Sequence, residues 1–219
     1  MWTLRYFSVA RGAGRKLSPG WEAVVTMDHA LRLWFLALYA LGIAGFLGNV
    51  LRIRRARPVF EQQIGPLPEV GALVAWFIPP LILLSGVGTM AMEQPILPVI
   101  GVGLSLYSQI MVAWTVRTLG RLLIPGLAVF PDHVLVTSGP FRWVRHPLYS
   151  GALALWLGTA LGTLNWLLLA LWPLFVAVII RELPTEERML RAKFGAPYEA
   201  YAAQTGRLVP RLWGRRSST

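Results

Sequence analysis

The residues best suited to chemistry lie in two polar segments on either side of a long apolar stretch. The first segment holds His133, Arg145 and His146, and the second holds Arg181 and Glu186. Imidazole, guanidinium and carboxylate groups can bind and orient a charged ligand. The chain has no cysteine and only 3 histidines, which excludes disulfides and cysteine nucleophiles and argues against a metal site. We therefore expect no bound metal.

The first segment, residues 132–151, reads D-H-V-L-V-T-S-G-P-F-R-W-V-R-H-P-L-Y-S-G and is rich in donors and aromatic side chains. Pro147 suits the first turn of a helix, where an N–H has no partner in any case. The positive end of that helix, beside Arg145 and His146, would suit a carboxylate or a phosphate. The alternative interpretation is an interfacial anchor of Arg, Trp and Tyr residues.

The second segment predicts a short helix at the membrane surface. Thr185 is a candidate N-cap, the first turn would hold Glu186 and Glu187, and Gly195 would end the helix. Its apolar face would consist of Met189, Leu190 and Phe194. For Glu187 and Glu199, an ordinary solvated position is an equally good interpretation.

The composition indicates an integral membrane protein. Hydrophobic residues make up 55% of the 219 residues and charged residues only 14%, whereas soluble domains usually carry about 25% charge. The formal net charge is +11. On so apolar a chain, this excess favours an anionic lipid surface over nucleic acid as a partner.

Four apolar stretches can be placed in a membrane. The first three are uncharged and comprise residues 33–51, 70–92 and 95–116. The fourth, 148–180, has 33 uncharged residues and would be about 50 Å long as one helix, against a hydrocarbon core of about 30 Å. Residues 162–165 have turn composition, so this stretch predicts two short antiparallel helices, 148–161 and 166–181. Such a hairpin would bring the two polar segments together at one membrane face.

These elements define the predicted organisation. We expect an all-α integral membrane protein with about five membrane helices, the last two forming the hairpin 148–181. A tail would occupy residues 1–29, three membrane helices 30–116, and a catalytic half with a cytosolic C-terminal segment 117–219. Met27 is an alternative start of the natural chain.

The basic residues predict the orientation. Of 21 in the chain, four lie in 52–57, four in 117–145 and eight from Arg181 onward, whereas none lies in the turns at 93–94 and 162–165. The positive-inside rule therefore places these turns away from the cytoplasm and the catalytic face toward it. The N-terminus would then lie outside, despite its own basic residues.

The two polar segments together resemble a known family. G-P-F-R-W-V-R-H-P-L-Y-S-G, followed about 35 residues later by E-E-x-x-L-x-x-x-F-G-x-x-Y-x-x-Y, is similar to the membrane methyltransferases. This group includes isoprenylcysteine carboxyl methyltransferase and the phospholipid N-methyltransferases. The resemblance covers roughly residues 117–210. It implies S-adenosylmethionine as the methyl donor, bound on the cytoplasmic side of the membrane, with the bacterial inner membrane as the expected location.

The resemblance also implies roles for individual residues. Cofactor contacts would come from His133, Val134, Leu135, Val136, Phe141, Arg145, His146, Pro147, Leu148, Tyr149 and Glu186. Arg181 and Glu186 would be catalytic, with Arg181, Tyr198 and Tyr201 contacting the acceptor. The spacing of Arg181 differs from the family pattern by about one residue, and Phe141 stands where the family often has tyrosine.

Methyl transfer from a sulfonium is an in-line displacement, so the protein's main task is alignment and exclusion of water. His146 suits a hydrogen-bonding role better than that of a general base. The acceptor is expected to be lipophilic and to enter from the bilayer. Two alternatives remain: a reductase similar to the sterol reductases, which bind NADPH, and a non-catalytic membrane component.

Overall fold

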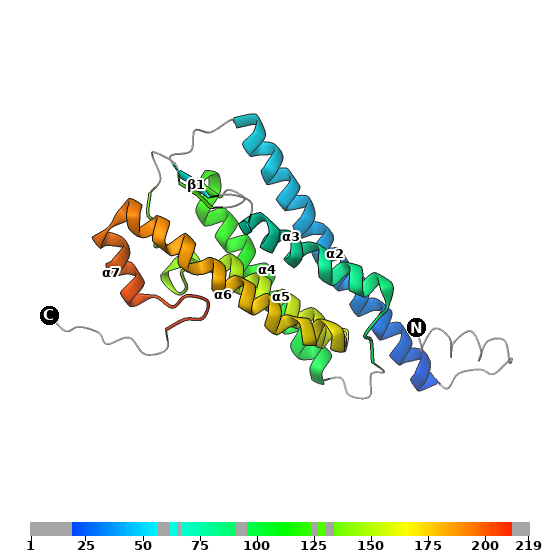
Figure 1. Cartoon of the computed structure of the whole chain (residues 1–219). Coiled ribbons are helices and arrows are strands. Elements are labelled where there is room, and N and C mark those ends of the chain that lie inside the picture. Colours follow the sequence, from blue (N-terminus) through cyan, green and yellow to red (C-terminus); the bar gives the residue numbers. More distant parts are fainter. Residues whose placement is uncertain are drawn as a thin grey trace.

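The computed structural model describes residues 19–56, 62–64, 67–90, 96–123, 127–129 and 134–211. Apart from two strands of three residues, the regular elements of this part are helices, as predicted (Figure 1). The elements are α2 (Pro19–Ala56), β1 (Gln62–Ile64), α3 (Leu67–Ser85), α4 (Ile96–Leu119), η1 (Gly120–Leu122), β2 (Leu127–Val129), η2 (Gly139–Arg142), α5 (Pro147–Gly162), α6 (Trp166–Phe194) and α7 (Ala196–Gln204). β1 pairs with β2 in antiparallel register.

Three of the described helices are long and apolar enough to cross a membrane: Met27–Arg52, Ile96–Leu119 and Trp166–Phe194. This supports an integral membrane protein. Helix α3 has 19 residues and α5 has 16. The expected total of about five membrane helices therefore stays a prediction.

The apolar stretch 148–180 is broken into two helices by residues 163–165. Asn165 caps α6, because its side-chain oxygen accepts a hydrogen bond from the Leu168 N–H at 3.0 Å. Its side-chain amide donates to the Val87 carbonyl at 2.8 Å, and the Trp166 N–H donates to the Gly88 carbonyl at 2.9 Å. The loop after α3 therefore holds the turn between α5 and α6 in place.

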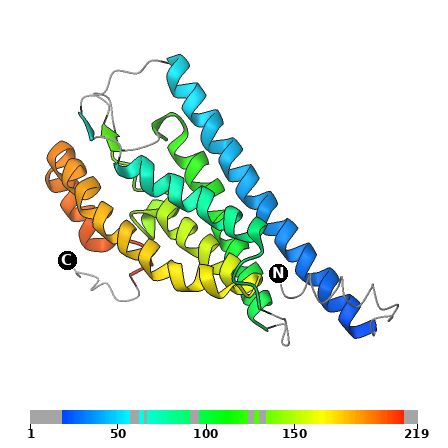
Figure 2. The ribbon, with the colours of Figure 1, turned by 45° about the vertical axis from the view of Figure 1, so that its right-hand side comes forward.

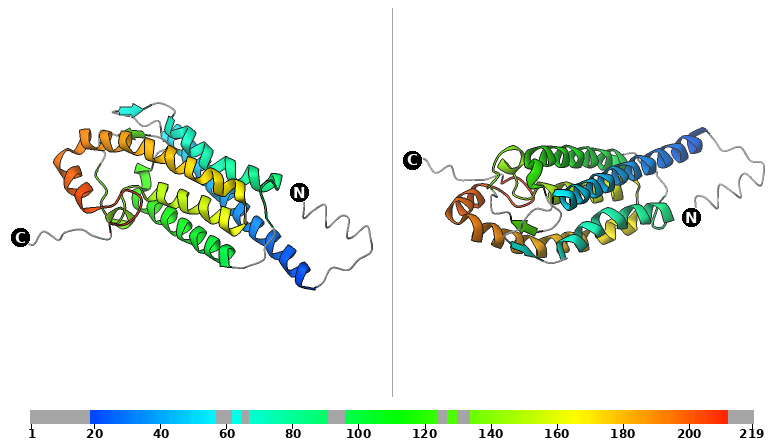
Figure 3. Two further views of the ribbon diagram at one scale, coloured as in Figure 1. Left: turned by 60° about the horizontal axis from the view of Figure 1, so that its bottom comes forward. Right: turned by 90° about the horizontal axis from the view of Figure 1, so that it is seen from above.

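Helices α4, α5 and α6 lie side by side, with α5 in the middle (Figure 3). The approach of α4 to α5 requires glycine: a Cβ on Gly101 would lie 2.3 Å from the Gly162 backbone nitrogen and 2.5 Å from the Gly158 carbonyl oxygen. On the other side of α5, the rings of Trp156 and Phe175 stack with centroids 4.5 Å apart. Tight packing on both sides of α5 thus fixes the position of its first residues and that of α6 beside it.

Helix α6 corrects one prediction. It runs unbroken to Phe194, with Pro184 inside it, so Thr185 is not the N-cap of a separate surface helix. Ile179, Leu183 and Glu187 are all buried. Their four-residue spacing keeps one face of the helix packed past the proline. As predicted, the helix ends at Gly195, whose φ of +56° suits glycine.

The N-terminal region also differs from expectation. Helix α2 begins at Pro19, so the last part of the predicted tail 1–29 is helical. The beginning of α2 lies at one end of the molecule, whereas α7 and the last turns of α6 lie at the other (Figures 1 and 2).

Candidate functional site

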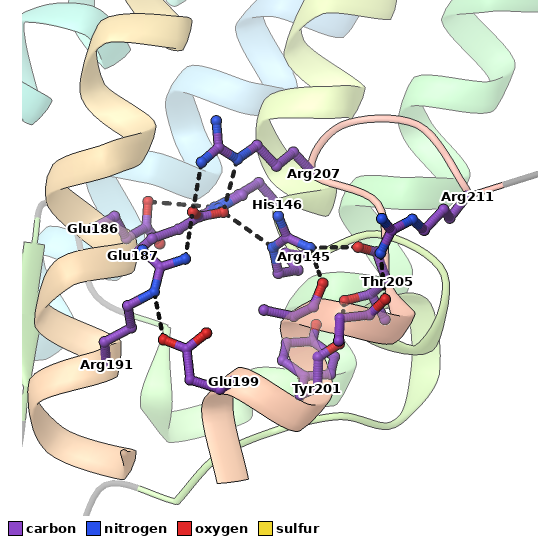
Figure 4. Close-up of polar contacts among 12 residues, drawn as sticks. Arg145, His146, Glu186, Glu187, Arg191, Glu199, Tyr201, Thr205, Arg207 and Arg211 are labelled. Carbon is purple, nitrogen blue, oxygen red and sulfur yellow. Dashed lines mark hydrogen bonds and ion pairs between the residues drawn. The ribbon is translucent and has the colours of Figure 1, made fainter. Parts of the chain in front are cut away.

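The two polar segments of the sequence meet at the α7 end of the molecule. Arg145 and His146 immediately precede α5, whereas Glu186 and Glu187 lie on α6. A third group of residues, from the segment that follows α7, lies beside them and includes Thr205 and Arg207 (Figure 4). The structure therefore joins three parts of the chain in one polar cluster.

Glu187 lies at the centre of this cluster. Its side chain is fully buried, and its Oε1 accepts hydrogen bonds from Nε of Arg145 at 3.0 Å and Nε of Arg207 at 3.2 Å. Its Oε2 accepts from Nη2 of Arg207 at 2.9 Å and lies 3.5 Å from Nη2 of Arg191. We call Glu187, Arg145, His146, Arg191 and Arg207 the Glu187 cluster.

His146 lies between the two adjacent carboxylates. Its Nε2 is 3.5 Å from Oε1 of Glu187, and its Nδ1 is 3.5 Å from Oε2 of Glu186. Burial opposes the charged imidazolium, but hydrogen bonds to Glu186 and Glu187 and their negative charges outweigh it and raise the pKa of His146 to about 9. His146 is therefore a charged donor at neutral pH.

Arg145 forms hydrogen bonds with the end of α7 and with the segment that follows it. Its Nη1 donates to the Ala202 carbonyl at 2.8 Å and to the Thr205 carbonyl. The backbone N–H groups of Arg145 and His146 donate to the carbonyls of Gly206 and Arg207 at 2.8 and 3.0 Å. Much of the hydrogen-bonding capacity of Arg145 is thus used inside the protein.

Helix α7 borders the cluster with two tyrosines. Tyr198 is fully buried, Arg191 lies 5.6 Å above its ring, and its hydroxyl has no hydrogen-bond partner among the described residues. The hydroxyl of Tyr201 donates to the Phe141 carbonyl at 2.8 Å and so ties α7 to η2. At the rim, Glu199 pairs with Arg191 at 2.8 Å.

The other predicted site residues are spread more widely. Pro147 is buried at the start of α5, whereas Leu135, Val136, Phe141, Leu148 and Tyr149 are half-buried and Val134 is exposed. The ring of Tyr149 is 5.9 Å from that of His146. His133 lies outside the described residues.

Arg181 stands apart from the Glu187 cluster. It is exposed on α6, six residues before Glu187, and its side chain makes no hydrogen bond or ion pair with another described residue. Its proposed role toward the acceptor stays a prediction.

The sequence analysis missed three residues of the cluster. Glu187 is as compatible with a solvated position as with a functional one on sequence alone, and Arg191 and Arg207 are only two of eight basic residues from Arg181 onward. The available signal for Glu187 is its spacing of four from the apolar Leu183 and of eight from Ile179, which continues the buried face of α6.

Part of the chain, including most of the residues of the site, is similar to known proteins. Residues 96–197 match the sequence model of a family described as phospholipid methyltransferase. Protein-S-isoprenylcysteine O-methyltransferase of Tribolium castaneum is 37% identical over 84 residues, which is 38% of this chain and 30% of that protein. Methanethiol S-methyltransferase 2 of Bradyrhizobium diazoefficiens is 43% identical over 76 residues, 35% of this chain and 29% of that protein.

A third relative comes from a plant. The probable protein-S-isoprenylcysteine O-methyltransferase of Oryza sativa subsp. indica is 38% identical over 84 residues, 36% of this chain and 42% of that protein. The matches thus span less than half the length of each of these relatives.

Proposed function

We propose, from the match of residues 96–197 to the phospholipid methyltransferase family, that this protein is a membrane methyltransferase that uses S-adenosylmethionine. The relatives named above bear out the resemblance to the isoprenylcysteine methyltransferases. The observation that carries the proposal is the unequal use of the two adjacent carboxylates. Glu187 is enclosed by guanidinium groups, whereas Glu186 has an ion pair only with His146 among the described residues, is hydrogen-bonded to Tyr149, and keeps 29% of its side chain exposed.

The chemistry of the side chains fits this cofactor. A half-exposed carboxylate such as that of Glu186 is a good partner for a cationic amino group or for ribose hydroxyls. The buried hydroxyl of Tyr198 offers an unused donor and acceptor in the adjoining wall. Glu186 and His146 would hold the polar end of the cofactor, with Tyr149 and Phe141 as aromatic neighbours.

When bound, S-adenosylmethionine supplies an electrophilic methyl group on a positively charged sulfur. The residues of this chain would bind and orient its polar end and keep water away, since alignment is the main requirement of an in-line displacement. His146 is charged at neutral pH and so acts as a donor rather than as a base. A carboxylate or a thiolate acceptor needs no base from the protein.

The acceptor is proposed to be lipophilic and to enter from the bilayer, because the site adjoins helices with apolar outer surfaces. Exposed apolar residues on α4 and α6 include Leu106, Ile110, Leu174 and Ile180. The names of the relatives include isoprenylcysteine, a lipid-modified residue, and methanethiol, a small thiol. Both kinds of acceptor could reach the site past apolar side chains. We propose that the site faces the cytoplasm, at a surface of anionic lipids.

Calorimetry on the detergent-solubilised protein tests the cofactor. We expect binding of S-adenosylmethionine and of its demethylated product S-adenosylhomocysteine, and loss of binding in Glu186→Ala. The exposed Glu199→Ala is the control, expected to bind like the wild type. Binding of NADPH in place of both compounds would contradict the proposal.

The acceptor is identified in a second experiment. Membrane lipids and isoprenylated or small thiols are incubated with the protein and isotopically labelled S-adenosylmethionine, and products are analysed by mass spectrometry. We expect label in a lipophilic product, and none when Glu186→Ala replaces the wild type.

A further inference from the structure

Glu187 is fully buried and has more charged partners than any other described carboxylate. Its partners come from three parts of the chain: Arg145 and His146 before α5, Arg191 on α6, and Arg207 after α7 (Figure 4). Because both oxygens already accept hydrogen bonds within the protein, Glu187 has little capacity left for a ligand.

The arrangement of His146 shows what this carboxylate does instead. Glu186 and Glu187 are consecutive on α6, and they approach opposite nitrogens of the same imidazole ring, each at 3.5 Å. A ring held in this way by two carboxylates is oriented, and only the doubly protonated form can donate to both. The burial of the ring, which is 4% exposed, leaves it little freedom to turn away.

We propose that Glu187 is a positioning residue: it orients His146 as an imidazolium whose Nδ1–H is directed at Glu186 and so places the Glu186 carboxylate for the cofactor. The last step rests on the proposed function. Glu187 favours the charged form of His146, whereas the positive charge of Arg207 disfavours it. Arg207 pairs with Glu187 from the solvent side and keeps 49% of its own side chain exposed.

The charged and titratable groups around His146 set the sign of each effect. Helix α6 contributes Glu182, Glu186, Glu187 and Arg191, α5 contributes Tyr149, α7 contributes Tyr198, and Arg145 and Arg207 complete the set. Removal of a negative charge from this set disfavours the imidazolium, and removal of a positive charge favours it.

The test is the titration of His146 in the ligand-free, full-length protein. Histidine is labelled with ¹³C, the protein is solubilised in detergent, and NMR spectra are recorded from pH 6 to pH 10. The signal of His146 is assigned by its absence in His146→Gln. We expect the midpoint to fall by about 1 unit or more in Glu187→Gln, since an opposite charge at this distance shifts a pKa by about 1–3 units.

Arg207→Gln provides the decisive comparison. It is expected to raise the midpoint of His146, although it destabilises the protein as Glu187→Gln does. A purely structural role would lower the stability of both variants and leave both midpoints at the wild-type value, which would overturn the proposal. If Glu187→Gln does not fold, the direction in Arg207→Gln decides alone: an unchanged or lowered midpoint overturns the proposal. Glu199→Gln is the matched control, with an unchanged midpoint.

A binding profile links this role to the cofactor. The affinity for S-adenosylhomocysteine is measured by calorimetry over the same pH range. In each variant, the pH at which the affinity falls on the alkaline side is expected to move with the His146 midpoint. If this pH stays constant while the midpoint changes, the link to Glu186 is overturned. The titration needs no cofactor, so absence of binding by the wild type counts against the proposed function alone.

Discussion

Two adjacent glutamates on one helix have different environments because consecutive residues point about 100° apart around the axis. Glu187 continues the buried face formed by Ile179 and Leu183, whereas Glu186 is turned toward His146 and solvent. Burial of Glu187 is tolerated only because guanidinium groups surround it, since an unpaired buried charge is very costly. The half-exposed neighbour is thereby left for ligand binding.

The raised pKa of His146 predicts a pH-dependent stability. The folded pKa of about 9 lies above the unfolded value of 6.5, so the stabilisation is fully present below pH 6.5 and is lost as the pH rises through about 9. Its full size is of the order of 3 kcal/mol. Thermal unfolding in detergent from pH 6 to pH 10 measures it. The expected slope between pH 6.5 and 9 should be much reduced in His146→Gln, and an equal slope in both proteins would contradict it.

Replacement of Arg145 predicts a large loss of stability. Arg145→Ala removes a partner of the buried Glu187 and the hydrogen bonds to the carbonyls of Ala202 and Thr205. Removal of one partner of a buried ion pair costs about 3–5 kcal/mol. Arg142→Ala, three residues earlier and exposed, should change the free energy of unfolding by no more than about 0.5 kcal/mol. Chemical denaturation of both variants measures the difference, and similar losses would contradict this account.

At the level of elements, the contact between α4 and α5 determines where the first polar segment lies. A methyl group on Gly101 would overlap the backbone of α5 at Gly158 and Gly162, which cannot move aside as a side chain can. Gly101→Ala is therefore expected to separate the helices and to lower the unfolding temperature by several degrees, since overpacking costs about 1–3 kcal/mol. Gly103→Ala on the same helix has open space and should be neutral or slightly stabilising. Equal effects of the two variants on thermal unfolding would contradict this packing.

The elements differ in how well the sequence predicts them. The break between α5 and α6 follows from residues 162–165, because one helix of that length would not fit a bilayer and Asn165 is a good N-cap. The sequence does not predict the continuity of α6 through Pro184, because the proline followed by Thr185 favours the start of a new helix there. The burial of Ile179, Leu183 and Glu187 on one face of α6 outweighs this local preference.

The same distinction applies to the site. His146 and Glu186 can be identified from their motif, and the structure places them 3.5 Å apart. The role of Arg207 depends on the path of the chain after α7, where the backbone pairs with residues 144–146. Local sequence carries no signal for such pairing between segments about 60 residues apart.

At the level of the whole molecule, the polar cluster lies at one end, and residues 86–90 after α3 lie toward the other, where Val87 contacts Asn165 (Figure 2). The distribution of basic residues predicts that the cluster end faces the cytoplasm. The exposed Arg181 and Arg188 at that end agree with this orientation, whereas the exposed residues of the opposite loop include the apolar Val87 and Met90.

This orientation can be tested with single cysteines, because the natural chain contains none. Arg188→Cys and Val87→Cys place one thiol at an exposed position at each end, outside the polar cluster. A membrane-impermeant maleimide is applied to right-side-out and to inverted bacterial vesicles. We expect Arg188→Cys to be labelled only in inverted vesicles and Val87→Cys only in right-side-out vesicles. The reverse pattern would place the site outside the cell, away from the cytoplasmic supply of S-adenosylmethionine, and would contradict the proposed function as well as the orientation.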